Sequence, residues 1–440
     1  MTSLTTTQVK ALSTASIVSL TTEDMAAIST AQMKVLSSAQ IAALETVDLA
    51  ALNSSQLSAV SSTSIAGLSA AQLAVIDSAK ISALGTGQIA ALSSAQVGNL
   101  SSAQIAAMTS TQIGALSSTA IASLATEDFA TLDSADIAAI SSKSIAGLST
   151  TNVAALTTAQ LAGLSTSQVA AFTTAQIGAL STASIAALST GQVAALGSTQ
   201  AAALGGTQIQ SLTTAQVSAL STKAIAGLSS SQIDTLNTNV AGLTTDQLAV
   251  MNSTQVSAFL ADDVDTFSTA EIAAINAKGI AGLKTIALAS FDTAQIAALT
   301  TAQLSAMTST QFASLTTAQV GALTSTQAAG LGSAQVAALS TANIAVLSTA
   351  AAGALSSKAI TSLTSAQVTA LTTDQVAALT TTQIAGLSSG AIAALGTDDI
   401  ATFSSAEIAL ISSKSIAGLG TAAIAALTTA QTAGLTSAQV

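Results

Sequence analysis

The chain has 440 residues, of which 50% are hydrophobic, 7% charged and 2% aromatic, and its formal net charge is −11. It contains no His, Cys, Trp, Tyr or Pro, which excludes disulfides, thiolate metal sites and histidine-based catalysis. Nine basic residues and few aromatic ones provide no basic surface for phosphates and little stacking for bases. We therefore expect no nucleic-acid partner, no cofactor and no enzymatic activity.

The first twenty residues, "MTSLTTTQVKALSTASIVSL", lack the basic segment and solid apolar core that are typical of a signal peptide. No apolar run anywhere in the chain approaches the roughly 20 residues of a membrane helix. We therefore predict neither a signal peptide nor a transmembrane segment.

The next feature along the chain is an eight-residue repeat, marked by Leu or a similar residue from Leu4 to Leu236. A seven-residue step at 237–243 shifts the register by one residue, and the octads then continue from Leu243 to Leu435. Twenty-nine octads, one heptad and 24 further octads follow one another. This self-similarity predicts one continuous octad-repeat solenoid over residues 1–440.

Each octad carries the signals of a helix start. In "LSSAQIAA" (36–43), Ser37 is a preferred N-cap residue, and Gln40 follows at the spacing of a capping box. Leu36 and Ile41, at octad positions 1 and 6, have the spacing of a hydrophobic staple. We predict a helix of about six residues in every octad. Helices that short are unstable alone, so neighbouring octads must stack and bury positions 1 and 6.

The predicted fold class is therefore all-α, a solenoid of very short helices, with a β-solenoid as the alternative. A strand would place Leu36 and Ile41 on opposite faces, which disfavours the alternative. Small residues at positions 7 and 8, as in "IAGL" at 65–68, 145–148 and 416–419, would let neighbouring helices approach closely. The octad by itself does not reveal how many repeats complete one coil.

Three charged blocks, at 126–148, 261–283 and 397–419, interrupt the nearly uncharged repeat at spacings of 135 and 136 residues. In each block an acidic residue at position 5 precedes a Lys at position 4 by two octads. Two octads per coil would stack these residues as structural ion pairs, whereas three would give a shorter, thicker rod. The expected pairs are Asp128 with Lys143, Asp263 with Lys278, and Asp399 with Lys414.

Acidic residues also occur in pairs at predicted helix starts, as in Glu127–Asp128 and Asp398–Asp399. The positive end of the helix dipole explains such residues without any ligand. A calcium site is the alternative, with Asp262, Asp263 and Asp265 as candidate ligands, because Ca²⁺ takes six to eight oxygen ligands. We identify no catalytic residue, because no Ser has a recognisable general base beside it.

The two chain ends are in phase. Met1 and Val440 both occupy octad position 6, so a second molecule placed after Val440 resumes the repeat at Thr2. We expect either that the chain is part of a larger protein or that its ends meet head to tail. A head-to-tail contact that does not close would build a filament.

The octads "LTTAQVSAL" (212–220) and "LSSAQIAAL" (36–44) resemble Ser/Thr/Ala/Gln-rich octapeptide tracts of large bacterial secreted or surface proteins. The resemblance implies an exported structural protein, located outside the cell or on its surface. Our leading hypothesis is a non-enzymatic repeat rod that associates with itself, end to end or side to side, in an extracellular filament or surface layer. The alternative is a repetitive binding scaffold, either ice-binding or an adhesin stalk.

Overall fold

The computed structural model describes residues 3–440, and these form 53 α-helices, one 3-10 helix (η1) and no strand. Every α-helix begins at octad position 3 and ends between positions 6 and 8, from α1 (Thr6–Lys10) to α53 (Thr429–Gly434). Twenty-nine α-helices precede η1 and 24 follow it. The prediction of one short helix per octad is therefore confirmed, and the β-solenoid alternative is wrong.

The helices are four to six residues long because each octad both starts a helix and ends the one before it. In α22 (Thr174–Ala179) the N-cap residue Thr173 is extended, and its hydroxyl accepts the Gln176 N–H. At the other end Leu180 adopts an extended conformation, with φ −64° and ψ 137°. The chain thus leaves the helix at the apolar residue of position 1 and is capped again at once by the next Ser or Thr.

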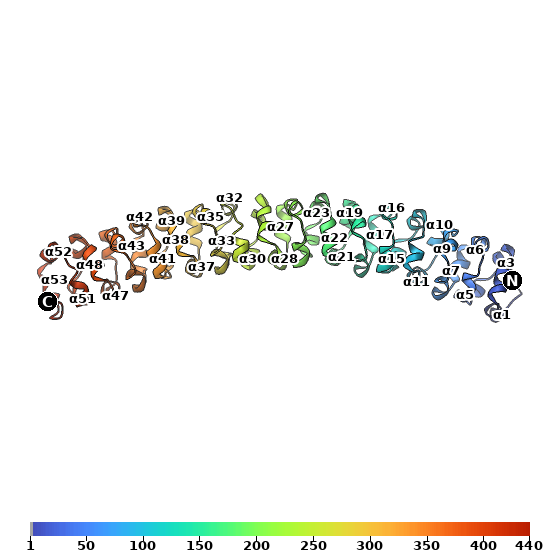
Figure 1. The fold of residues 1–440 in the computed structure, drawn as a ribbon, viewed down its shortest axis with the longest axis horizontal. Coiled ribbons are helices and arrows are strands. Elements are labelled where there is room, and N and C mark those ends of the chain that lie inside the picture. The colour runs from blue at the N-terminus through green and yellow to red at the C-terminus, as the bar shows by residue number, and fades with distance from the viewer. Residues whose placement is uncertain (1–2) are drawn as a thin grey trace. The chain divides into compact units, whose positions relative to one another are not determined.

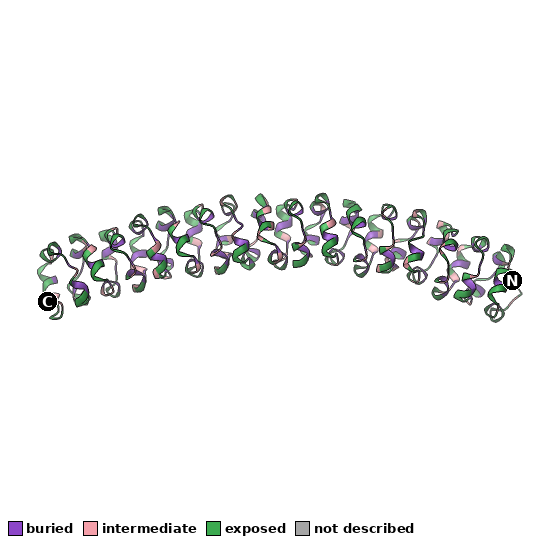
Figure 2. Cartoon of the chain, in the orientation of Figure 1, coloured by how far each residue is buried: buried purple, intermediate pink, exposed green. Residues whose placement is uncertain are grey.

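The chain divides into two compact units, Met1–Gly227 and Leu228–Val440. Within each unit the helices wind in successive coils (Figure 1), with buried residues facing inward and exposed residues facing outward (Figure 2). Within each unit most helices pack against the third helix before them and the third after them. In the first unit, α22 contacts α19 (Thr150–Ala155) and α25 (Ser198–Ala202).

Positions 1 and 6 form the core, as the staple spacing predicts. In α22 and the residue that follows it, Ile177 is 0% exposed and Leu180 is 3% exposed. Phenylalanine enters the same layers, since Phe172 and Phe259 replace the Leu of position 1 and are also buried. Because all described helices are four to six residues long, none of them can cross a bilayer.

The heptad at 237–243 forms η1 (Asn237–Gly242), which follows α29 (Ser230–Thr235) in the second unit. Here the chain does not leave the helix in extended form. Leu236 stays helical, and Asn237 has a φ of 48°, in the left-handed region. Asn tolerates this region better than most residues. The packing pattern also changes at the heptad. Here α29 contacts α31 (Ser253–Val256), which is the second α-helix after it and not the third.

Replacing Asn237 with Ala should destabilise the second unit by about 1–2 kcal/mol, because a Cβ-bearing residue without a short polar side chain is strained at positive φ. Replacing it with Gly should be tolerated. Urea unfolding followed by far-UV circular dichroism measures the difference. Thr238→Ala, at an exposed neighbouring position, is the control and should have little effect. Equal losses in the free energy of unfolding for the two Ala variants would show that the positive φ of Asn237 is not the cause.

Candidate functional site: a glutamine ladder between coils

The glutamine at octad position 5 is buried, although it is a polar residue on a short surface helix. Gln176 is 2% exposed. Its Oε1 accepts the Thr173 N–H at 2.7 Å, and its own N–H donates to Thr173 Oγ1 at 3.2 Å. These two bonds form the capping box that the sequence predicts, and they use only the oxygen of the carboxamide.

The nitrogen of the same carboxamide reaches the previous coil. Gln176 Nε2 donates to the carbonyl oxygens of Ile145 at 3.0 Å and Leu148 at 2.8 Å. Both carbonyls lie at or just beyond the end of α18 (Ser142–Ile145), where a helix leaves its acceptors without intrahelical donors. One side chain therefore caps the start of its own helix and the end of the helix four places earlier.

The span of these bonds sets the size of the coil. Leu148 and Ile145 precede Gln176 by 28 and 31 residues. A helix thus lies over the gap between the third and fourth helices before it. One coil takes about 28 residues, or three and a half octads, so neither two nor three octads per coil describes the fold.

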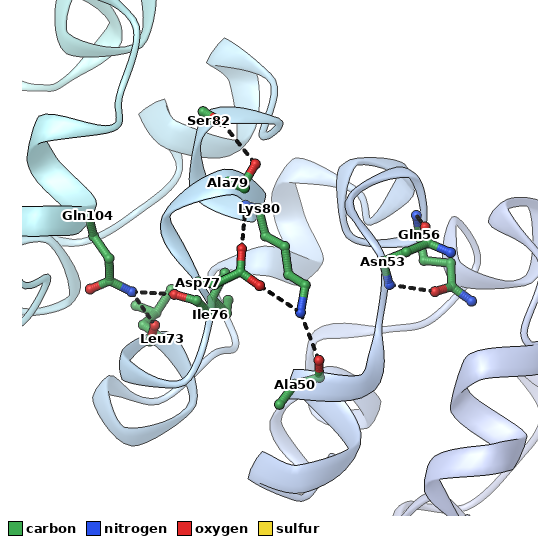
Figure 3. Close-up of polar contacts among 10 residues, drawn as sticks. All are labelled: Ala50, Asn53, Gln56, Leu73, Ile76, Asp77, Ala79, Lys80, Ser82 and Gln104. Carbon is green, nitrogen blue, oxygen red and sulfur yellow. Dashed lines mark hydrogen bonds and ion pairs between the residues drawn. The ribbon is translucent and has the colours of Figure 1, made fainter.

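The same pair of bonds repeats through both units and forms what we call the glutamine ladder. Figure 3 shows one rung, in which Gln104 Nε2 donates to the carbonyls of Leu73 at 2.8 Å and Ile76 at 2.7 Å. Four shorter polar residues, Ser64, Ser144, Asn152 and Asn343, keep the bond to the residue 28 places earlier, as when Asn152 Nδ2 donates to the Leu124 carbonyl at 3.1 Å. Further complete rungs are made by Gln56, Gln208, Gln303, Gln311 and Gln375.

The charged blocks interrupt the ladder, because an ionised carboxylate at position 5 cannot donate. Asp128 Oδ1 instead accepts a hydrogen bond from Ser102 Oγ at 2.8 Å, across 26 residues. Asp399 Oδ1 accepts from Thr373 Oγ1 at 2.9 Å in the same arrangement. These acidic residues also cap their own helices, since Asp128 Oδ2 accepts the Ala125 N–H. The polarity of the inter-coil bond is therefore reversed at these octads.

The structure does not bring the expected ion pairs together. Helices two octads apart are not neighbours, and α16 (Thr126–Phe129), which carries Asp128, packs against α13 (Ser102–Ala106) and α19. The ion pair seen between described side chains is a local one, Lys80 Nζ to Asp77 Oδ2 at 3.0 Å, and Lys80 also donates to the Ala50 carbonyl (Figure 3). The residues not paired as expected are Asp128 with Lys143, Asp263 with Lys278, and Asp399 with Lys414.

The candidate calcium ligands lie on and beside α32 (Ala261–Val264), in the second unit. Asp262 and Asp265 are exposed, and half-buried Asp263 accepts the Leu260 N–H at 2.8 Å. Partial burial, together with the charges of Asp234 and Asp262, raises the pKa of Asp263, and the Leu260 N–H opposes this shift. Over residues 3–440, no three or more acidic side chains are grouped so that they could hold a metal ion.

The sequence is similar to one known repeat family. Matches to the family model described as "ALTTAQ repeat" together span residues 17–207 and 272–381, more than half of the chain. The chain belongs to the ALTTAQ repeat family. The individual matches are residues 17–47, 41–78, 72–102, 81–118, 94–126, 121–158, 129–166, 153–182, 169–207, 272–309, 287–317, 301–333, 312–349, 329–365 and 352–381. No curated protein matches the chain significantly.

The six letters of the ALTTAQ motif coincide with the structural unit. At residues 155–160 they comprise the position-8 Ala, the core Leu156, the cap residue Thr157, Thr158, a small residue and the ladder residue Gln160. Sequence reasoning identifies Gln only as a cap and misses its inter-coil donor. The missed signal is the preference for Gln over Glu, because a capping box accepts either residue, whereas only Gln can donate to a carbonyl.

Replacing Gln176 with Ala should destabilise the first unit by about 1–3 kcal/mol more than Gln8→Ala does, because it removes the donor to two buried carbonyls. Gln8 is a matched control. It is exposed in α1 and makes the same capping box with Thr5, but the structure shows no inter-coil bond from it. Urea unfolding of dilute protein measures both losses, and equal losses would mean that the ladder adds nothing beyond the caps.

Proposed function

We propose that this ALTTAQ repeat protein is a non-enzymatic structural protein that assembles with copies of itself outside the cell, in a filament or surface layer. The observation that carries the proposal is the glutamine ladder. The hydroxyls of position 2 cap helices, and the carboxamide of position 5 caps one helix and joins two coils, as Thr173 and Gln176 do. The recurring polar chemistry of the repeat is thus used to hold the stack together.

The ladder also supports self-assembly, because the two faces of a coil differ. One face presents amide donors and the other presents carbonyl acceptors, and this pairing recurs with the same residue types in both units. A donor face of one molecule therefore suits an acceptor face of another. Contacts between unlike faces are heterologous, and they extend into filaments when they do not close into a ring.

An extracellular or cell-surface location is part of the same proposal. The chain has nine basic residues, all of them Lys, and 2% aromatic residues, so it offers few cleavage sites to common proteases. Such resistance suits a material exposed outside the cell. Antibody labelling of intact cells of the source organism tests the location. Labelling that requires permeabilised cells would contradict it.

Self-assembly is tested with the untagged chain by sedimentation velocity and negative-stain electron microscopy over a concentration series. We expect uniform fibres or sheets that lengthen with concentration. Gln8→Ala removes an unused ladder donor from α1, so end-to-end growth should weaken while the fold is kept. Particles of one size at every concentration would contradict self-assembly and would favour a spacer.

A binding scaffold is the second candidate, either for ice or as an adhesin stalk. It is favoured by the exposed outer surface of the octads, where Thr173, Thr174 and Ala175 are all exposed in α22 and its cap. Repetition of these positions presents regularly spaced hydroxyl and methyl groups. Thermal hysteresis at millimolar protein tests ice binding, and its absence would remove that version of the scaffold.

A further inference from the structure

Asp48 is a buried carboxylate that the ladder does not explain. It lies in α6 (Thr46–Ala51), at position 5 of its octad, and is 2% exposed. Its Oδ2 is fully buried and has no hydrogen-bond partner. The acidic residues of the charged blocks differ, since Asp128 Oδ1 and Asp136 Oδ1 each accept a Ser hydroxyl across 26 residues. An unpaired buried carboxylate is costly, so its protonation state has structural consequences.

Two asparagines occupy the same octad position as Asp48. Their side chains are as long as that of Asp but carry an N–H donor. Asn152 and Asn343 are 2% and 3% exposed. The Nδ2 of Asn152 donates to the Leu124 carbonyl at 3.1 Å, across 28 residues. Asn343 Nδ2 makes the equivalent bond at 3.0 Å. A protonated Asp has nearly the shape of Asn and carries one O–H donor. By the same spacing, the acceptor for Asp48 is the carbonyl of Leu20, just beyond α2 (Thr14–Val18).

The charges around α6 also favour the protonated form. Its neighbour α3 (Thr22–Ala27) carries Glu23 and Asp24, and Glu45 precedes α6 itself. Burial, then the charges of Glu45 and Asp24, raise the pKa of Asp48.

Among the other described elements near α6, one brings a positive charge. The helix α9 (Ala70–Ala74), which packs against α6, carries no charged residue, and neither does α2. Lys80 of α10 (Ser78–Ser82) donates to the Ala50 carbonyl of α6 and pairs with Asp77 at 3.0 Å.

We infer that Asp48 is a proton-operated link in the glutamine ladder. When its carboxyl is protonated, the O–H donates to the Leu20 carbonyl and closes the junction between α2 and α6. When it is ionised, the carboxylate cannot donate and the junction is open. Mild acid therefore tightens this coil of the first unit.

The sign of the pH dependence follows from the raised pKa. The folded chain binds the Asp48 proton more tightly than the unfolded chain does, so this contribution to stability grows as the pH falls through the raised pKa. It is complete below the unfolded-state pKa and absent at high pH. Asp24 and Asp77 have the opposite pH dependence. Hydrogen bonds lower the pKa of each of these carboxyls, so their contributions to the stability of the fold are lost in acid. Comparison of variants at each pH removes this background.

The test is hydrogen exchange of the full chain between about pH 3 and pH 8, comparing wild type, Asp48→Asn and Asp48→Gln. Near pH 7 the amides of α2 and α6 should exchange about tenfold more slowly in both variants than in wild type. At the acid end the Asp48→Asn difference should disappear. Glu127→Gln, which removes an exposed carboxylate at position 4 of α16, should leave α2 and α6 unchanged.

Four outcomes would overturn the inference. One is a difference between Asp48→Asn and wild type that is the same at every pH, and another is no difference at any pH. The third is slower exchange of wild type, but not of Asp48→Asn, when Ca²⁺ is added near neutral pH. That result would make a cation, and not a proton, the partner of Asp48. Unfolding of both variants would also contradict it, because each supplies the donor that the junction is expected to need.

Discussion

Replacing Ile177 with Asp is expected to unfold the coils around α22, with a loss of about 3–5 kcal/mol in the free energy of unfolding. Ile177 is 0% exposed at position 6, in the layer that stacked coils share. An Asp there would be a buried charge with no partner, which is among the most destabilising changes that a core can undergo. Urea unfolding followed by far-UV circular dichroism, with hydrogen exchange to locate the opened coils, measures the effect.

Ala175→Asp in the same helix is the matched control. Ala175 is exposed at position 4, and an acidic residue in the first turn interacts favourably with the helix dipole. We therefore expect its free energy of unfolding to stay close to that of wild type. Similar losses for the two Asp variants would show that the core is not the layer of positions 1 and 6.

Gly147→Ala is expected to be the second large effect, a loss of about 1–3 kcal/mol from overpacking. A Cβ on Gly147 would overlap the backbone carbonyl oxygen of Ser118, in α15 (Ser118–Ala122) of the neighbouring coil. Backbone cannot move aside as a flexible side chain can, so α18 would have to shift. Thermal unfolding with exchange measurements on α15 and α18 tests the prediction.

Gly178→Ala, in the same unit, should act in the opposite direction. The atom that its Cβ would meet is the Ala203 carbonyl oxygen at 3.7 Å, an ordinary contact distance. Ala is favoured over Gly inside a helix by about 0.5–1 kcal/mol. We expect a small gain in stability, and a loss as large as that of Gly147→Ala would contradict the close approach as the cause.

Close approach at Gly147 accompanies a short ladder residue. Ser144 replaces Gln at position 5, and its hydroxyl reaches the Leu116 carbonyl directly at 3.1 Å. At Gly147 position 8 has no room for a side chain. A similar overlap, of Gly434 with the Ser405 carbonyl, follows a ladder glutamine, Gln431, so a short residue at position 5 is not required for it. The same overlap with a Ser carbonyl 29 residues earlier is found at Gly67, Gly227, Gly282 and Gly418, each three residues after Ser, Ala or Gly. The small-residue prediction for "IAGL" is thus confirmed.

The sequence by itself determined the secondary structure, because its signals are local. Ser37 and Gln40 lie three residues apart, and the capping box between them forms within one turn. Leu36 and Ile41 are close enough to identify the apolar side of the same helix. The positions of the helix starts, the count of helices and the core layers all follow from contacts within one octad.

Only the tertiary structure decided the coil, and with it the candidate site. The partner of Gln176 lies 28 residues away, and an octad repeat looks the same whichever octad it packs against. For that reason the sequence could neither locate the second half of the glutamine ladder nor rule out the Asp128–Lys143 pair, which needs a two-octad coil. Burial of Asp48 is hidden for the same reason, since its environment comes from helices that precede and follow it by several octads.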